Sequence, residues 1–229
     1  MSTTPWFAQN LPSGPDGYGF IIDFDDEGDL SKFEVTVVDG NLTGLWDAVI
    51  SDASTGEALF TNGAADDDSQ EYQLKKEILS LNALSRTIWI FARAKISDAT
   101  QEDFAFGLAA RDTTFITATD NGLLFRKTDG STNIDLEVRA SGATSGSSAA
   151  AGTMTTAYRE YAIRIVTDAN TLGTGVTTFY IDGTPVGSAI NTAALPTTEM
   201  ALSFGFRNGE AVAKTLTMDS IGVWYPGAR

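Results

Sequence analysis

Apolar and polar residues alternate along segment after segment of this 229-residue chain, and that alternation restricts the fold more than any other feature. IDLEVR (134–139) alternates strictly, with its aliphatic residues on one side and its charged residues on the other. TIWIFARAKI (87–96) and YAIRIV (161–166) show the same period of two. Because this is the period of a β-strand with one buried face, the pattern predicts an antiparallel sheet protein.

Further strand-like segments continue the pattern, with turn signals between them. FAFGL (104–108), VTTFYI (176–181), LSFGF (202–206) and LTMDSIGVW (216–224) are expected strands. In the last of these the apolar side changes, which indicates a β-bulge near Asp219–Ser220. D-G and N-G pairs tolerate the positive φ of tight hairpins. These pairs are Asp39-Gly40, Asn121-Gly122, Asp129-Gly130, Asp182-Gly183 and Asn208-Gly209.

Two segments depart from the alternation. ASGATSGSSAAAGTMTT (140–156) consists mostly of small residues, and we expect a long mobile hairpin loop there. DDDSQEYQLKKEILSL (66–81) begins with acidic residues and places Leu74, Ile78 and Leu81 at helical spacing, which fits a helix. The same residues also fit an irregular strand, so both interpretations stay open.

Residues 1–17 contain three prolines and no strand pattern, so we expect an extended arm ahead of one domain at 18–229. Trp6 and Phe7 are large apolar residues on that arm. Because exposed aromatic side chains are unfavourable, we expect both to dock on the domain or on a neighbouring molecule. The segment has no basic residue and no apolar run, so no signal peptide is expected.

Cysteine and histidine are both absent from the chain. Their absence excludes disulfides, thiolate metal sites and a Ser-His-Asp triad within the chain. The formal net charge of −15 repels the phosphates of nucleic acids and of anionic membranes, so neither is an expected partner. No cofactor is expected.

The acidic segment DFDDEGDLSKFE (23–34) raises the question of calcium, because it nearly matches the EF-hand pattern. Strand-like sequences flank it, whereas an EF-hand needs a helix on each side. Two interpretations stay open. The segment is either the entry to the first strands or a bare calcium site in which a cation relieves like-charge repulsion. The acidic residues concerned are Asp23, Asp25, Glu27, Asp29 and Glu34.

The order of the segments resembles that of concanavalin A-like lectin/glucanase domains. GFIIDFDDEGDLSKFEV (19–35) is similar to their entry strand, with Phe33 where the family commonly has Trp. NGLLFRKTDGS, TTFYIDGTPVGS and ALSFGFRNGEAVAKTLTMDSIGVW follow one another as in laminin G-like domains. The resemblance covers residues 18–226. It implies an all-β antiparallel sandwich of the concanavalin A-like jelly-roll type, whose closing strand pairs beside the first.

The sequence RNGEAVAKTLTMDSI (207–221) is also similar to structural proteins of tailed bacteriophages. That resemblance implies a non-enzymatic virion protein, made in the host cytoplasm, that decorates the outside of the capsid. Its expected partners are the major capsid protein or other virion proteins, together with further copies of itself. Trp6 and Phe7 are the expected contact residues.

The glucanases of this fold carry E-x-D-x-x-E on one strand, and this chain has no such motif. Neither Glu137 nor Glu160 is matched by a second glutamate at that spacing, so no enzymatic activity is expected. The alternative function is a carbohydrate-binding, lectin-like module on a phage tail or fibre. Core packing or a subunit interface is the favoured interpretation of its candidate aromatic residues. They are Trp46, Trp89, Phe91 and Trp224.

Overall fold

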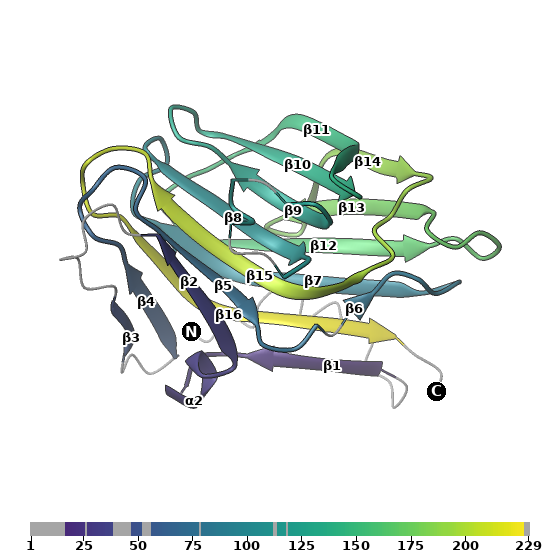
Figure 1. Cartoon of the computed structure of the whole chain (residues 1–229), viewed down its shortest axis with the longest axis horizontal. Helices are drawn as coiled ribbons and strands as arrows, with labels where there is room; N and C mark the ends of the chain where they lie inside the picture. Colours follow the sequence, from purple (N-terminus) through teal and green to yellow (C-terminus); the bar gives the residue numbers. More distant parts are fainter. Residues whose placement is uncertain are drawn as a thin grey trace.

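Two antiparallel β-sheets pack face to face in the computed structural model (Figure 1). The segments with a period of two form strands, as predicted. Each sheet has an apolar inner face, and the two inner faces bury one another, which is the arrangement of a β-sandwich. The structure describes residues 17–25, 27–38, 47–51, 56–77, 79–111, 114–117 and 119–226.

The first sheet has the strand order β14-β13-β12-β7-β16-β4-β3, with β1 beside β16. β1 and β4 pair with opposite ends of β16, so the closing strand lies beside the first strand, as expected. The strands are β1 (Gly17–Ile22), β3 (Asp47–Ser51), β4 (Glu57–Thr61), β7 (Thr87–Ile96), β12 (Arg159–Thr167), β13 (Gly175–Ile181), β14 (Thr184–Thr192) and β16 (Thr215–Pro226).

The second sheet has the strand order β11-β10-β9-β8-β15-β5-β2, with β6 beside β15. Its edge strands are therefore β11 on one side and β2 on the other. The strands are β2 (Phe33–Val38), β5 (Ser69–Leu74), β6 (Leu79–Ser80), β8 (Glu102–Ala109), β9 (Gly122–Lys127), β10 (Asn133–Ala140), β11 (Ala143–Thr153) and β15 (Glu199–Asn208).

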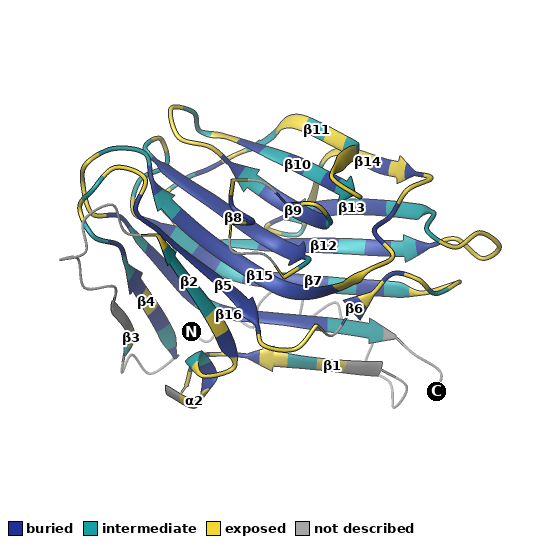
Figure 2. Cartoon of the chain, viewed as in Figure 1, coloured by how far each residue is buried: buried dark blue, intermediate teal, exposed yellow. Residues whose placement is uncertain are grey.

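Aromatic rings from the two sheets meet in the core. Phe60 of β4 lies 5.4 Å from Phe204 of β15, measured between ring centroids. Phe125 of β9 packs edge-on against Phe179 of β13 at 5.0 Å, and Tyr161 of β12 lies 5.4 Å from Phe125. All five rings are buried, and Figure 2 shows the central strands largely dark blue. These contacts hold the sheets together through the burial of large apolar surfaces.

Two local features of the strands agree with the sequence. The register of β16 against β7 shifts between Met218 and Ser220, which confirms the predicted bulge. Asp182 and Gly183 join β13 to β14 with φ values of 50° and 76°, the backbone of a type I′ turn. The Asp39-Gly40 pair lies outside the described residues.

Of the two interpretations left open for residues 66–81, the strand is correct, and the described residues of this segment form no helix. Residues 69–74 form β5, which is hydrogen-bonded to β15 on one side and β2 on the other. All six residues of β5 are buried, and Tyr72 lies in the core. Pairing with two neighbours satisfies the backbone of this segment, and that tertiary context outweighs the local helical spacing.

The mobile loop expected at 140–156 is also wrong, because residues 143–153 form the edge strand β11. Ser141 and Gly142, at φ values of 53° and 78°, make the tight turn from β10 into β11. Small residues let β11 approach β14 of the other sheet. A Cβ atom on Gly146 would lie 2.2 Å from a methyl carbon of Ile190. β11 is therefore held by backbone pairing with β10 and by close approach to β14, and it lacks the alternating side-chain pattern that usually marks a strand.

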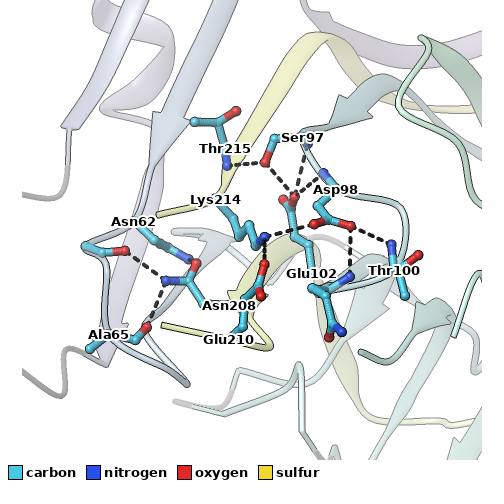
Figure 3. A network of polar contacts seen from close by, with 12 residues as sticks. Asn62, Ala65, Ser97, Asp98, Thr100, Glu102, Asn208, Glu210, Lys214 and Thr215 are labelled. Carbon is cyan, nitrogen blue, oxygen red and sulfur yellow. Dashed lines mark hydrogen bonds and ion pairs between the residues drawn. The ribbon is translucent and has the colours of Figure 1, made fainter. Parts of the chain in front are cut away.

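A buried polar network lies where β7, β8 and β16 meet (Figure 3). Lys214, with 5% of its side chain exposed, donates to the carboxylates of Asp98 and Glu210. Glu102 at the start of β8 is fully buried, and its Oε2 accepts the N–H groups of Ser97 and Asp98, each at 3.0 Å. The network ties the β7–β8 connection to the chain that leads into β16.

Burial raises the pKa of the Glu102 carboxyl to about 8, although hydrogen bonds from Ser97 and Asp98 and the charge of Lys127 oppose the shift. Between pH 4.5 and about 8, the folded chain therefore holds a proton here that the unfolded chain has lost. The free energy of unfolding should fall as pH rises through this window, by about 1.4 kcal/mol per pH unit at most.

The variant Glu102→Gln should remove that pH dependence, because its amide keeps the hydrogen bonds of the protonated acid at every pH. We expect the variant to match the parent near pH 4.5 and to exceed its stability near pH 9, as measured by urea unfolding. Glu199→Gln, a change at an exposed position on β15, is the matched control and should keep the parent slope. Parallel curves for the parent and Glu102→Gln would contradict the assignment.

Candidate functional site

The outer face of the second sheet gathers charged side chains over β9 and β10. Phe125 and Leu136 of these strands are buried in the core, so their neighbours in sequence point away from it. Arg126 stands opposite Asp135 in the β9–β10 register, and Glu137 is the next outward residue of β10. The alternation in IDLEVR thus places two carboxylates and a guanidinium on one surface.

A polar groove of about 220 Å³ lies over β9, β10 and β11. Carboxylates, a guanidinium and hydroxyl groups line it, so it presents both hydrogen-bond donors and acceptors to a ligand. The lining residues are Arg126, Asp135, Leu136, Glu137, Thr144, Ser147 and Ala149.

Two irregularities in the pairing of β11 with β10 lie beside this groove. The register shifts between Ile134 and Leu136 and again between Val138 and Arg139. At the first shift, the carboxylate of Asp135 accepts the N–H of a β11 residue, Ala150, at 2.7 Å. Bulges bend a strand and increase its twist, and they protect an edge strand from pairing with another chain. The same bulges shape the outer surface where the groove lies.

Glu137 lies between two guanidinium groups. Its Oε1 accepts from Arg139 at 3.0 Å, and its Oε2 lies 3.3 Å from Nε of Arg126. Only 15% of the side chain of Glu137 and of Arg126 is exposed. Burial lowers the pKa of the Arg126 guanidinium, and the charge of Glu137 opposes that effect. The cluster is held in place before any ligand arrives, which lowers the entropic cost of binding.

The connection between β8 and β9 covers the middle of the same outer face. Phe115 and Ile116 in this segment are buried against aliphatic side chains of β8 and β9. Arg126 donates to the carbonyl oxygens of Phe115 and Thr117, at 3.2 and 2.9 Å, and Glu71 accepts the N–H of Ile116 at 3.0 Å. Arg126 therefore both anchors this covering segment and lines the groove that the segment leaves open.

This groove was not predicted from the sequence. Asp135 and Glu137 alternate within IDLEVR, so the pattern predicted that both face outward. The segment lacks the glutamate pair of the glucanase motif, so it was not singled out as a site. Thr144 and Ser147 belong to the segment that we expected to be a loop. Their contribution depends on the pairing of β11 with β10.

The candidate aromatic platform lies on the outer face of the first sheet. Trp89 of β7 and Trp224 of β16 are register partners, and both are half-buried. The ring of Tyr180 lies 5.4 Å from Trp89. Phe91 is completely buried beside them, so it is a packing residue, in agreement with the favoured interpretation. Trp46 lies outside the described residues.

The acidic segment 23–34 connects β1 to β2 through a single helical turn, α2 (Glu27–Leu30), and the strands on either side exclude an EF-hand. Lys32 forms an ion pair with Asp29, and Arg111 forms one with Glu34. Within the described parts of the chain, no group of three or more acidic side chains is arranged to hold a metal ion. The segment therefore leads into β2, and the bare calcium site stays a prediction.

Phe24, which the sequence analysis did not single out, anchors this segment. Its ring is completely buried near Phe33 and Phe60, and its φ of 54° turns the backbone so that the ring enters the core. Asp23 and Asp25 on either side are exposed, and the segment passes close to Gly56. Alternation around Phe24 explains why Asp23 and Asp25 face outward.

Trp6 and Phe7 lie outside the described residues, so the extended arm and its contacts stay predictions. Among the described residues, no helix has the length and apolar character needed to cross a membrane.

Comparison with protein-family models gives no match, and comparison with curated proteins gives none either. Many solved structures are similar in fold, among them the following three. The carbohydrate recognition domain of Emp46p, in its metal-free form, is 10% identical with a TM-score of 0.57, over 90% of this chain and 95% of that one. Peanut lectin is 12% identical with a TM-score of 0.54, over 91% of this chain and 97% of the lectin. The endo-β-1,4-glucuronan lyase of the fungus Trichoderma reesei is 13% identical with a TM-score of 0.51, over 82% of this chain and 89% of the lyase.

These likenesses confirm the concanavalin A-like β-sandwich that the sequence predicts. The fold occurs in two lectin-type domains and in an enzyme, so it does not by itself decide the activity of this chain. None of the three likenesses concerns a bacteriophage or a capsid, and the virion role stays a prediction.

Arg126→Lys should loosen the covering segment, because lysine keeps the charge but does not present the planar fork of donors that reaches two carbonyls and Glu137. We expect amide hydrogen exchange at residues 114–117 to accelerate about tenfold or more, and the free energy of unfolding to fall by about 1–3 kcal/mol. Arg139→Lys is the matched control, since Arg139 contacts Glu137 without contacting this segment. Equal exchange in the two variants would contradict the role of Arg126.

Proposed function

We propose that the chain is a non-enzymatic carbohydrate-binding module whose ligand lies in the groove over β9, β10 and β11. The observation that carries the proposal is the polar lining of that groove, in which carboxylate, guanidinium and hydroxyl groups converge. The fold is shared with a carbohydrate recognition domain and with peanut lectin, which supports the assignment at the level of architecture.

The lining suits the chemistry of a sugar. Each sugar hydroxyl both donates and accepts hydrogen bonds, so a site with ionised acceptors beside ionised donors engages neighbouring hydroxyls in pairs. Asp135 and Glu137 supply acceptors, Arg126 supplies a donor, and the hydroxyls of Thr144 and Ser147 supply both. Ala149 adds a small apolar contact for the C–H groups of the ring.

The charges around the groove favour a neutral saccharide. Asp135 and Glu137 carry two negative charges, and Arg126 and Arg139 carry two positive charges close by. Since the four charges balance, the groove offers no excess positive charge to a uronic acid or a sulfated sugar. We therefore expect neutral oligosaccharides to bind more tightly than acidic ones.

Both carboxylates of the groove already have fixed partners, which supports binding over hydrolysis. Glu137 is paired with two guanidinium groups, and Asp135 accepts a backbone N–H from β11. Glycoside hydrolysis needs one carboxyl group placed as acid and a second placed as nucleophile or base, whereas these two are held as ion-pair and hydrogen-bond partners. Attachment to a capsid, or a place on a phage tail or fibre, stays a prediction beside this proposal.

A panel of neutral and acidic oligosaccharides, followed by titration calorimetry with the best ligand, tests the proposal. Glu137→Gln removes the charge that orders both arginines, and we expect it to weaken binding about tenfold or more. Glu34→Gln is the matched control, because Glu34 also pairs with an arginine but belongs to the opposite edge strand, β2. The control should bind like the parent.

EDTA should leave the affinity unchanged, since the groove contacts the sugar through the side chains named above. Three results would contradict the proposal: no binding across the panel, equal loss of binding in Glu137→Gln and Glu34→Gln, or binding that EDTA abolishes. Cleavage of the bound oligosaccharide would contradict its non-enzymatic part.

A further inference from the structure

A second cavity, with a very different lining, opens near β1 at the other edge of the sandwich. Its volume is about 410 Å³, and Phe20, Ile21 and Ile22 of β1 form one wall. Leu74 at the end of β5 contributes a further apolar surface. Figure 1 shows β1 along the lower side of the molecule, far in strand order from the groove over β9–β11. The cavity is therefore independent of the proposed sugar site.

The described polar residues that line this cavity are all lysines. Lys32, Lys75 and Lys76 lie around the apolar walls, and these are three of the six lysines in the chain. The chain carries 30 acidic and 15 basic residues, yet no described residue of the lining is acidic. A concentration of positive charge at this point runs against the composition of the whole protein.

Lys75 and Lys76 provide the charge that is available to a ligand. Lys32 is paired with Asp29, whereas Lys75 and Lys76 are exposed and form no ion pair with another described residue. Pairing of β2 with β5 fixes their position, because Lys75 follows the last residue of β5 and donates its backbone N–H to the carbonyl of Lys32 at 2.9 Å. The two lysines stand directly beside the apolar wall.

An apolar cavity with an exposed isoleucine at its mouth, and with two cations that form no ion pair among the described residues, is complementary to one class of molecule. Ile21 is 49% exposed and lines the cavity, so the apolar surface of the walls continues to the solvent-facing side of β1. An alkyl chain would cover Ile21 and fill the space between the apolar walls. An anionic head group would form ion pairs with the two lysines. We propose that this cavity binds a small amphiphile with an alkyl chain and one anionic head group, such as a fatty-acid carboxylate.

Titration calorimetry of the full chain with sodium carboxylates of six to twelve carbons tests the proposal. Each added methylene should tighten binding about fourfold until the cavity is full. Alcohols and alkyltrimethylammonium salts of the same length should bind more weakly, and raising the salt concentration should weaken carboxylate binding.

Lys75→Gln combined with Lys76→Gln should weaken carboxylate binding by about fivefold for each lysine removed. Lys95→Gln is the matched control, since Lys95 lies over the ring of Tyr158 and does not line the cavity. Ile21→Glu places a carboxylate at the mouth and should abolish binding. Thermal unfolding of each variant checks that the exposed substitutions leave the fold intact.

Vesicles of phosphatidylglycerol and of phosphatidylcholine distinguish a free amphiphile from a membrane lipid. Binding of carboxylates without vesicle binding identifies a free amphiphile. Saturable binding to phosphatidylglycerol vesicles that decanoate competes away identifies a membrane lipid, and either result supports the cavity. Affinity that does not depend on chain length, or that Lys95→Gln weakens as much as the double variant does, would overturn the proposal.

Discussion

Contact between aromatic rings across the two sheets is the interaction on which the rest of this structure depends. Phe60 meets Phe204, and Phe125 meets Phe179, each pair joining one sheet to the other. These rings lie on the inner faces of their strands. Because side chains alternate along a strand, the residues next to each ring point outward. The outer faces and the sheet edges are what remains for binding, and both proposed sites lie there.

Different structural features shape the two edges of the second sheet. At one edge, β11 consists of small residues and departs from regular pairing twice, and a polar groove lies beside the irregular stretch. At the other edge, β2 begins and β5 ends near β1 of the first sheet, and an apolar cavity opens there. The core supplies rigidity, whereas the edges supply two surfaces of contrasting chemistry.

Strands with one buried face were predictable from sequence, because burial imposes alternation; IDLEVR and TIWIFARAKI are the clearest examples. β11 was not predictable in this way, since it is held by backbone hydrogen bonds and close approach to β14, neither of which needs a side-chain pattern. Residues 66–81 carry helical spacing at Leu74, Ile78 and Leu81, but the first half of this segment forms β5, which pairs with two neighbouring strands. The groove was partly visible in Asp135 and Glu137, but its wall from β11 depended on a strand that local sequence does not indicate.

A crystal structure of the chain with its tightest oligosaccharide would test the central claim most directly. The account predicts the sugar over β9, β10 and β11, with hydroxyls within hydrogen-bond distance of Arg126 and Glu137 and the covering segment at Phe115 unmoved. A sugar stacked instead on Trp89 and Tyr180, on the outer face of the first sheet, would contradict the account and transfer the binding function to the aromatic surface.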